Sequence, residues 1–157
     1  LRAVQKPDDL EARTGMLLGS MLAGQAFANS PVAAVHALAY PIGGHYKVPH
    51  GLSNALVLPH VLRFNAQVAP EAYAELLPHV FPDLRAMNVA DAAMKFAQSM
   101  ADLSKACGLE QGLREMGIAR EVLPKLARDA MNQTRLLVNN PRPVDEAAAM
   151  QIYEAAW

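Results

Sequence analysis

The chain has 157 residues, enough for one domain with its own hydrophobic core. Hydrophobic residues make up 52% and charged residues 18%, which is typical of a globular protein and excludes a disordered one. The formal net charge is -1 and no run of Lys or Arg occurs, so the electrostatic pattern of a nucleic-acid binder is excluded.

Cysteine usage and hydropathy give an expectation for location. Cys107 is the only cysteine, so no internal disulfide can form, which agrees with a reducing cytoplasm. The most apolar run, residues 15–28, is too short to cross a bilayer, and the acidic residues before it are unlike a signal peptide. We therefore expect a cytoplasmic protein without a membrane partner.

The apolar residues recur with a helical period from the first predicted element onward. Asp8 predicts the N-cap of a first helix that extends to about residue 28. Ser30 and Pro31 predict the start of a second helix, which carries residues 32–40. Pro41 and the two glycines that follow it are expected to end or kink that helix.

The second half of the chain continues the helical pattern. A third helix is expected from Pro49 to about residue 64, with a bend at Pro59, and a shorter one from Pro70. The clearest pattern begins at Asn88, a predicted N-cap, and stops at Gly108. Two further helices are expected near residues 121–132 and 145–156. No strand-like alternation or internal repeat stands out, so we predict an all-α, multi-helix bundle.

Two histidines are the strongest candidates for chemistry. His36 and Tyr40 lie four residues apart, on one face of the second predicted helix, in apolar surroundings. A buried neutral imidazole needs a partner at each ring nitrogen, which a metal and an acceptor would provide; the alternative is a core histidine bonded to backbone. His50 opens the next helix after a glycine-containing loop and can point back toward His36, with Gly51 leaving room beside it.

The segment around these histidines resembles the metal-binding signature of the iron-containing alcohol dehydrogenase family. The similarity is carried by VHALAYPIGGHYKVPHG and the SNALVLPHVLRFN that follows it. It extends to DLEARTGMLLGSMLAGQAFANS, LREMGI and NPRPVDEAAAMQIYEAAW, and so covers nearly the whole chain. In that family the first histidine and the histidine of the PHG element are metal ligands, which implies His36 and His50 as ligands here.

The resemblance also implies an activity and a set of cofactors. The expected reaction is hydride transfer between a small alcohol or aldehyde and NAD(P), with Fe(II) as the family's metal and Zn(II) as an equally good fit. A maleylacetate reductase-like enzyme of the same superfamily and a non-catalytic helical interaction module are alternatives.

The same resemblance implies an incomplete enzyme. In the family, an aspartate and a second histidine complete the metal site, and they precede the point where this chain begins. We therefore expect residues 1–157 to be a single all-helical domain that lacks an upstream nucleotide-binding domain. Alone it should be inactive, and we expect a homo-oligomer.

One position departs from the family pattern. The family usually carries a histidine four residues after the first ligand, in a proton-transfer or substrate-contact role, and this chain has Tyr40 there. The resemblance therefore implies Tyr40 as the catalytic residue, although a phenol exchanges protons less readily than an imidazole at neutral pH. His45 is a second candidate, with an exposed loop position as the favoured alternative. His60 is interpreted as packing near the cleft and His79 as a surface residue.

Overall fold

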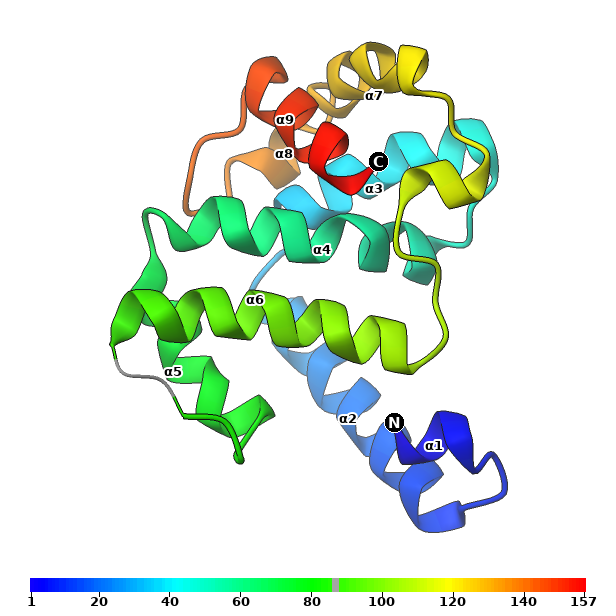
Figure 1. Ribbon diagram of the computed structural model, residues 1–157, viewed down its shortest axis with the longest axis vertical. Coiled ribbons are helices and arrows are strands. Elements are labelled where there is room, and N and C mark those ends of the chain that lie inside the picture. Colours follow the sequence, from blue (N-terminus) through cyan, green and yellow to red (C-terminus); the bar gives the residue numbers. More distant parts are fainter. Residues whose placement is uncertain (86–87) are drawn as a thin grey trace.

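The structure, a computed structural model, describes residues 1–85 and 88–157, and helices without any strand make up its regular elements (Figure 1). This confirms the all-α prediction. The α-helices are α1 (Arg2–Gln5), α2 (Leu10–Asn29), α3 (Ala34–Tyr46), α4 (His50–Ala66), α5 (Pro70–Val80), α6 (Val89–Ala106), α7 (Leu123–Ala130), α8 (Thr134–Leu137) and α9 (Glu146–Ala156). Two short 3₁₀ helices are η1 (Leu113–Met116) and η2 (Arg120–Val122).

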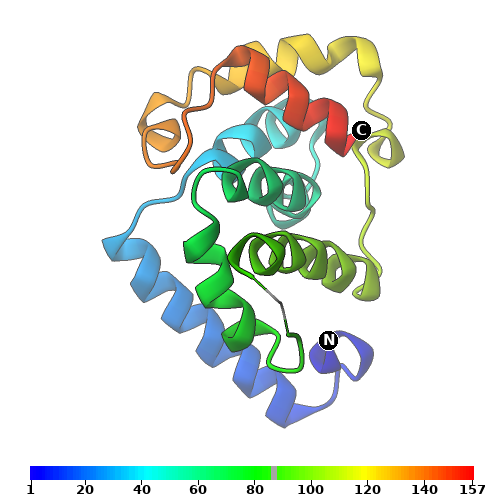
Figure 2. The same ribbon diagram turned by 60° about the vertical axis from the view of Figure 1, so that its left-hand side comes forward.

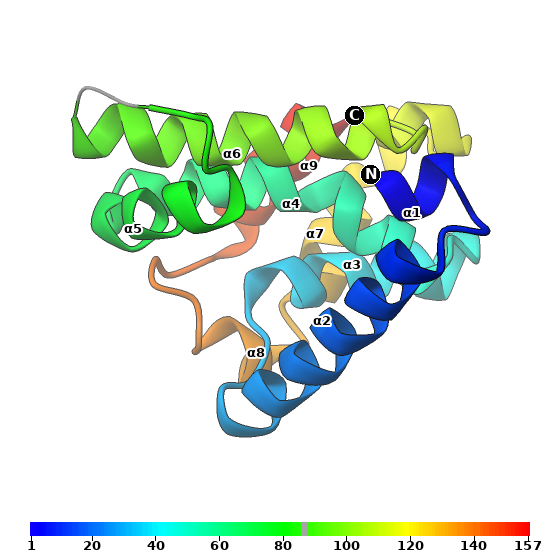
Figure 3. The same ribbon diagram turned by 90° about the horizontal axis from the view of Figure 1, so that it is seen from below.

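Helix α4 lies at the centre of the molecule and contributes to both hydrophobic clusters. On one side it packs with α3 and α9, in a cluster to which α7 also contributes and where Leu38, Val57 and Tyr153 are completely buried. On the other side it packs with α5 and α6 around Leu62 and Phe96 (Figures 1 and 3). Because α4 packs into both clusters, the backbone of His50, its first residue, is held in a fixed position.

Helix α2 lies apart from this bundle, as the long blue helix of Figure 2. None of its residues is buried, and Leu17 and Phe27 expose 74% and 57% of their surface. The helix nevertheless has a well-formed N-terminus, where the Asp9 carboxylate accepts a hydrogen bond from the amide of Ala12 at 3.0 Å. No helix in the described part of the chain combines the length and the apolar character needed to span a bilayer.

The predicted helix starts are confirmed in part. Asn88 accepts a hydrogen bond from the Asp91 amide at 2.9 Å and begins α6, as predicted. The helix predicted to begin after Asp8 is α2, and Asp9, one residue later, is its N-cap. Residues 120–122 are a 3₁₀ turn rather than the start of the predicted helix near residue 121, and α8 lies in a segment for which no element was predicted.

The prediction for α3 was wrong at both ends. The helix begins at Ala34 rather than directly after Pro31, and it runs through Pro41 and both glycines to Tyr46. Pro41 and Ile42 are buried against the core, and this burial outweighs the backbone hydrogen bond that proline forgoes. Proline-containing helices recur in α4 and α5, where Pro59 and Pro78 also lie inside the helix.

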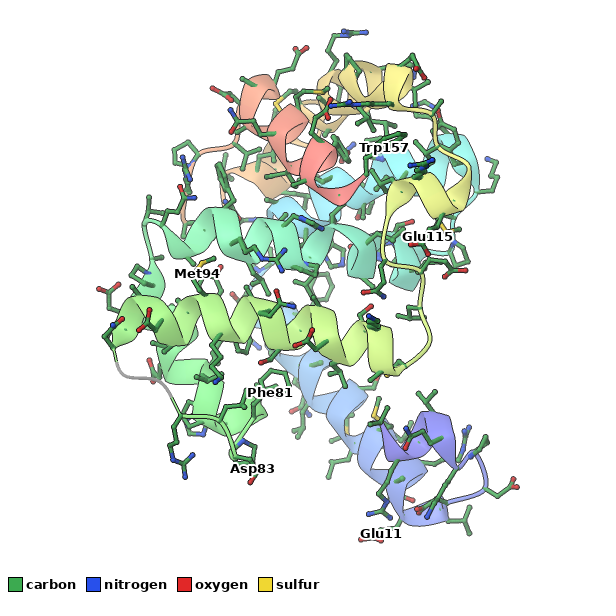
Figure 4. The ribbon with its side chains drawn as sticks, in the orientation of Figure 1. Glu11, Phe81, Asp83, Met94, Glu115 and Trp157 are labelled. Carbon is green, nitrogen blue, oxygen red and sulfur yellow. The ribbon has the colours of Figure 1, made fainter. Side chains whose placement is uncertain are left out.

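Helix α9 fastens two other parts of the chain. The buried hydroxyl of Tyr153 donates a 2.6 Å hydrogen bond to the carbonyl of Leu38 in α3. Trp157, labelled in Figure 4, donates from its indole nitrogen to the carbonyl of Ile118 at 2.8 Å. The C-terminal helix therefore holds both the α3 helix and the turn after η1.

A polar network fixes the loop before α9 to the end of α4. Asn65 and Asn140 exchange two amide hydrogen bonds, of 2.9 Å and 2.7 Å. Arg142 donates to the carbonyl of Phe64 at 3.1 Å and covers the ring of the same residue at 3.9 Å. Asn65 is almost fully buried, so this pairing satisfies polar groups that would otherwise be costly to bury.

Candidate metal centre

The structure brings His36, Tyr40 and His50 together. His36 lies in the first turn of α3 and His50 is the first residue of α4, and residues 47–49 reverse the chain between them. The ring centroids of His36 and His50 are 5.2 Å apart, with the rings tilted by 57°. The ring of Tyr40 lies 6.1 Å from that of His50. The predicted return of His50 toward the His36 face is therefore present.

The reversal depends on the end of α3. Lys47 adopts a left-handed conformation, with φ 58°, and its amide donates to the carbonyl of Gly43 at 3.0 Å. An added Cβ at Gly43 would lie 3.4 Å from the carbonyl oxygen of Val48, about van der Waals contact, so this part of α3 lies directly against the turn. The buried hydroxyl of Ser53 donates to the same carbonyl at 3.2 Å and ties the turn to α4.

The separation of the two rings suits a shared ligand. An imidazole centroid lies about 3.2 Å from a metal bound through one ring nitrogen, so two rings at a tetrahedral angle have centroids about 5 Å apart. The 5.2 Å between His36 and His50 matches that spacing. At Gly51 an added Cβ would meet no other atom within 4 Å, so the space beside His50 is open.

The surroundings of His36 favour its neutral imidazole form. Partial burial lowers the pKa of His36 below its ordinary value, and the neighbouring His50 lowers it further. His36 is therefore uncharged at neutral pH and keeps a lone pair on one ring nitrogen. A neutral imidazole of this kind is a good ligand for Fe(II) or Zn(II).

At this site the described residues bring together two imidazoles, His36 and His50, and no third possible ligand. Within residues 1–85 and 88–157, no group of three or more His, Cys, Asp or Glu side chains is placed to hold a metal. A divalent metal of the Zn(II) type takes four ligands in closed sites and three in catalytic ones. The two imidazoles are fewer donors than either kind of site requires.

His45 faces another part of the molecule. It lies in the last turn of α3, and its Nε2 is 2.7 Å from a carboxylate oxygen of Asp129 in α7. The ammonium of Lys125 is 2.9 Å from the same nitrogen and 2.6 Å from the same carboxylate. Lys125 first and His45 second lower the pKa of Asp129. The expectation of an exposed loop was thus half right, because His45 is exposed but lies in a helix, in contact with Asp129 and Lys125.

His60 and His79 lie away from the pair. His60 is ten residues after His50 in α4, which separates their backbones by about 15 Å along the helix axis. It packs in a partly buried position between α4 and α6, where burial first and Arg63 second lower its pKa to about 4. His79 is exposed on α5, as expected.

Sequence reasoning missed two features beside the pair. Asn54 is one helical turn after His50, and its amide nitrogen is 3.1 Å from Nε2 of that histidine. A cavity of about 160 Å³ adjoins Tyr40 and is otherwise lined by residues 132–136, which include Gln133, Thr134 and Arg135. Only the four-residue spacing from His50 pointed to Asn54, and no local pattern linked residues 132–136 to Tyr40.

Comparison with known proteins gives one family along the whole chain. Residues 1–157 match the model of the Fe-containing alcohol dehydrogenase family, C-terminal. The chain is 36% identical over 156 residues to long-chain-alcohol dehydrogenase 1 of Geobacillus thermodenitrificans (strain NG80-2), covering 99% of this chain and 40% of that protein. It is 34% identical over 168 residues to the mitochondrial hydroxyacid-oxoacid transhydrogenase of Pongo abelii, covering 99% and 36%.

A solved structure shares the fold closely. A 1,3-propanediol oxidoreductase crystal structure matches with a TM-score of 0.94 and 35% identity, over 99% of this chain and 41% of that one. The chain therefore spans about two fifths of the length of the relatives that it matches.

The partly buried His60 predicts a pH effect on stability. Its pKa of about 4 in the folded protein lies below the ordinary value of 6.5, so the unfolded chain binds more protons between these values. The free energy of unfolding should fall as the pH drops from 7 to 4.5, with His60 contributing on the order of 1–2 kcal/mol after allowance for solvent screening.

Urea unfolding of the wild type and of His60→Gln at both pH values measures that contribution. The variant should lose less stability on acidification than the wild type, whereas His79→Gln, at an exposed position, should behave as the wild type does. If the wild type and His60→Gln lost equal stability on acidification, the attribution of this loss to His60 would be contradicted.

Proposed function

The chain belongs to the Fe-containing alcohol dehydrogenase family, and we propose that His36 and His50 bind the metal of an enzyme that transfers hydride between an alcohol and NAD(P). The observation that carries this proposal is the convergence of the two imidazole rings, 5.2 Å apart, within a family match that covers the whole chain. Both residues are expected as ligands from their positions in the family motif. In the whole protein, we propose that this domain binds the metal.

The donor set fits a divalent metal. Imidazole nitrogen suits Fe(II) and Zn(II) alike, so either ion is compatible with the proposal. When bound, such an ion acts as a Lewis acid that lowers the pKa of an alcohol hydroxyl. The chain's own contribution is to present two ring nitrogens, and the desolvation that keeps His36 neutral preserves its lone pair for that purpose.

Tyr40 is proposed to face the substrate. It lies one turn after His36 on the same helix, with 42% of its surface exposed and its ring 6.1 Å from that of His50. A phenol can both donate and accept a hydrogen bond, so it can orient a substrate oxygen beside the two imidazoles. Because His45 is engaged by Asp129 and Lys125, Tyr40 is the better candidate for the catalytic position.

Two further expectations belong to the same proposal. The single cysteine supports a cytoplasmic enzyme. The exposed apolar side chains of α2 support a homo-oligomer.

Metal titration tests the ligand assignment. Isothermal titration of the chain with Zn(II), and with Fe(II) without oxygen, should give one binding event per chain. His36→Ala and His50→Ala should each weaken it by at least about tenfold, since each removes one of two protein nitrogens. His79→Ala is the matched control, because His79 is exposed on a distant helix and should leave binding unchanged.

The same titration separates enzyme from interaction module. A weak signal that is identical in the wild type and in His50→Ala would mean that both histidines are structural. The chain would then be better described as a non-catalytic helical module.

The cavity beside Tyr40 favours a second candidate substrate class. Its volume of about 160 Å³ is below the roughly 300–1,000 Å³ of complete ligand pockets, so it has the size of a subsite for a short substrate. Arg135 lines it beside the hydroxyl and amide groups of Thr134 and Gln133. Among the described residues, no carboxylate lies within 4.0 Å of the Arg135 guanidinium. This chemistry would suit the carboxylate of a hydroxy acid or oxo-acid, as in a maleylacetate reductase-like enzyme.

Substrate comparison in the whole protein tests this candidate. If Arg135 binds a carboxylate, Arg135→Gln should raise KM for a short oxo-acid by about tenfold or more, the loss of one charge-assisted hydrogen bond. KM for a short unbranched alcohol should stay the same, which serves as the internal control. An equal change for both substrates would contradict a carboxylate subsite at Arg135.

A further inference from the structure

Helix α2 carries exposed apolar side chains around most of its circumference. Side chains that expose more than half of their surface occupy three of its sides: Leu17 and Met21, Leu18 and Leu22, and Met16 and Phe27. Gly15 and Gly19 lie on the remaining side, where an added Cβ would meet no other atom within 4 Å. We call these residues the α2 surface.

This pattern is typical of a helix with neighbours on several sides. An amphipathic helix needs a partner along one side, whereas a helix that is apolar all round is normally buried. Among the described residues, only the short helix α1 packs against α2 to any extent, and no residue of α2 is buried. Residues 1–157 therefore do not supply the neighbours that the sequence of α2 calls for.

A second unfilled apolar surface lies nearby. A cavity of about 430 Å³ is formed by the end of α5, the residues that follow it and the second half of α6, and its apolar lining includes Val80, Phe81, Leu84 and Leu103. In Figures 1, 2 and 3 the segment after α5 lies on the side of α6 that faces α2, and Figure 4 labels Phe81 there. The α2 surface and this cavity thus lie on the same side of α6.

A segment that covers these surfaces has to satisfy its own backbone hydrogen bonds. The surfaces are mostly helical, and the amide and carbonyl groups inside a helix are already paired, so they offer no edge to an added strand. A helix pairs these groups within itself and can place its apolar side against α2. The expected occupant is therefore helical and apolar.

The position of the N-terminus indicates where such an occupant comes from. Leu1 directly precedes α1, the element that packs against α2 (Figures 1 and 3). The chain matches the C-terminal part of its family and spans about two fifths of the 1,3-propanediol oxidoreductase chain. In a protein of that length, the residues before Leu1 would lead into the domain beside α2. A second copy of the chain would cover one side of α2 and leave the opposite side exposed.

We propose that the α2 surface is an intramolecular docking site, surrounded in the whole protein by apolar helices of the segment that precedes Leu1, which also cover the cavity beside Phe81. Self-association of the 157-residue chain through α2 is the expected result when that segment is missing. The proposal does not involve the metal, and it would stand if His36 and His50 bound none.

Hydrogen–deuterium exchange of the whole protein and of the 157-residue chain tests this directly. In the whole protein, the amides of residues 15–27 should exchange at least about 100-fold more slowly than in the monomeric 157-residue chain, because packing suppresses local opening. Residues 80–84 should also exchange more slowly. Residues 149–153 of α9 are the internal control, because they pack within the chain itself and should exchange alike in both proteins.

Two results of this experiment would overturn the proposal. The first is equally fast exchange of α2 in both proteins. The second is protection of α2 in the whole protein that disappears when dilution separates its oligomer, because a second copy would then be covering the helix.

Leu17→Gln gives a matched test by substitution. Glutamine and leucine have similar helix propensities, so the variant should unfold as the wild type does in the monomeric 157-residue chain, where Leu17 exposes 74% of its surface. In the whole protein it should lower the Tm by about 3 °C or more, because a polar side chain would be buried there.

The control for this substitution is Val68→Gln, at an exposed position between α4 and α5. It should leave the Tm unchanged in both proteins. If Leu17→Gln also matched the wild type in the whole protein, no segment would be packed against this side of α2, and the proposal would fail.

Discussion

The chain reversal between α3 and α4 is the constraint on which the candidate site depends. Three residues separate the helices, and the left-handed Lys47, whose amide donates to the carbonyl of Gly43, makes so short a connection feasible. The turn places the first residue of α4 beside the first two turns of α3, where His36 and Tyr40 lie. A longer or differently bent connection would leave two unrelated histidines on neighbouring helices.

The two hydrophobic clusters keep this reversal rigid. Helix α4 is held on one side by α3 and α9 and on the other by α5 and α6, so it cannot shift without disturbing a packed core. Tyr153 adds a buried hydrogen bond that ties α9 to the carbonyl of Leu38, two residues after His36. The site is thus built on helices rather than on mobile loops, which suits a centre whose ligands must be held in fixed geometry.

Local sequence chemistry predicted the parts of the fold that depend on local interactions. The predicted N-cap Asn88 begins α6 as expected, and the spacing of His36, Tyr40 and His50 indicated that they meet. The extent of α3 escaped prediction because Pro41 is a local helix breaker that tertiary burial overrides. The contact of His45 with Asp129 joins residues 84 positions apart, and no periodic pattern reports such a pairing.

Whether His36 and His50 bind one metal ion together is tested most directly by X-ray absorption spectroscopy of the Zn(II)-loaded chain. The account predicts a first shell containing two imidazole nitrogens at about 2.0–2.1 Å, with the remaining positions filled by solvent oxygen. A first shell of oxygen alone, or one with a single imidazole, would contradict it, because the two rings would then not share an ion.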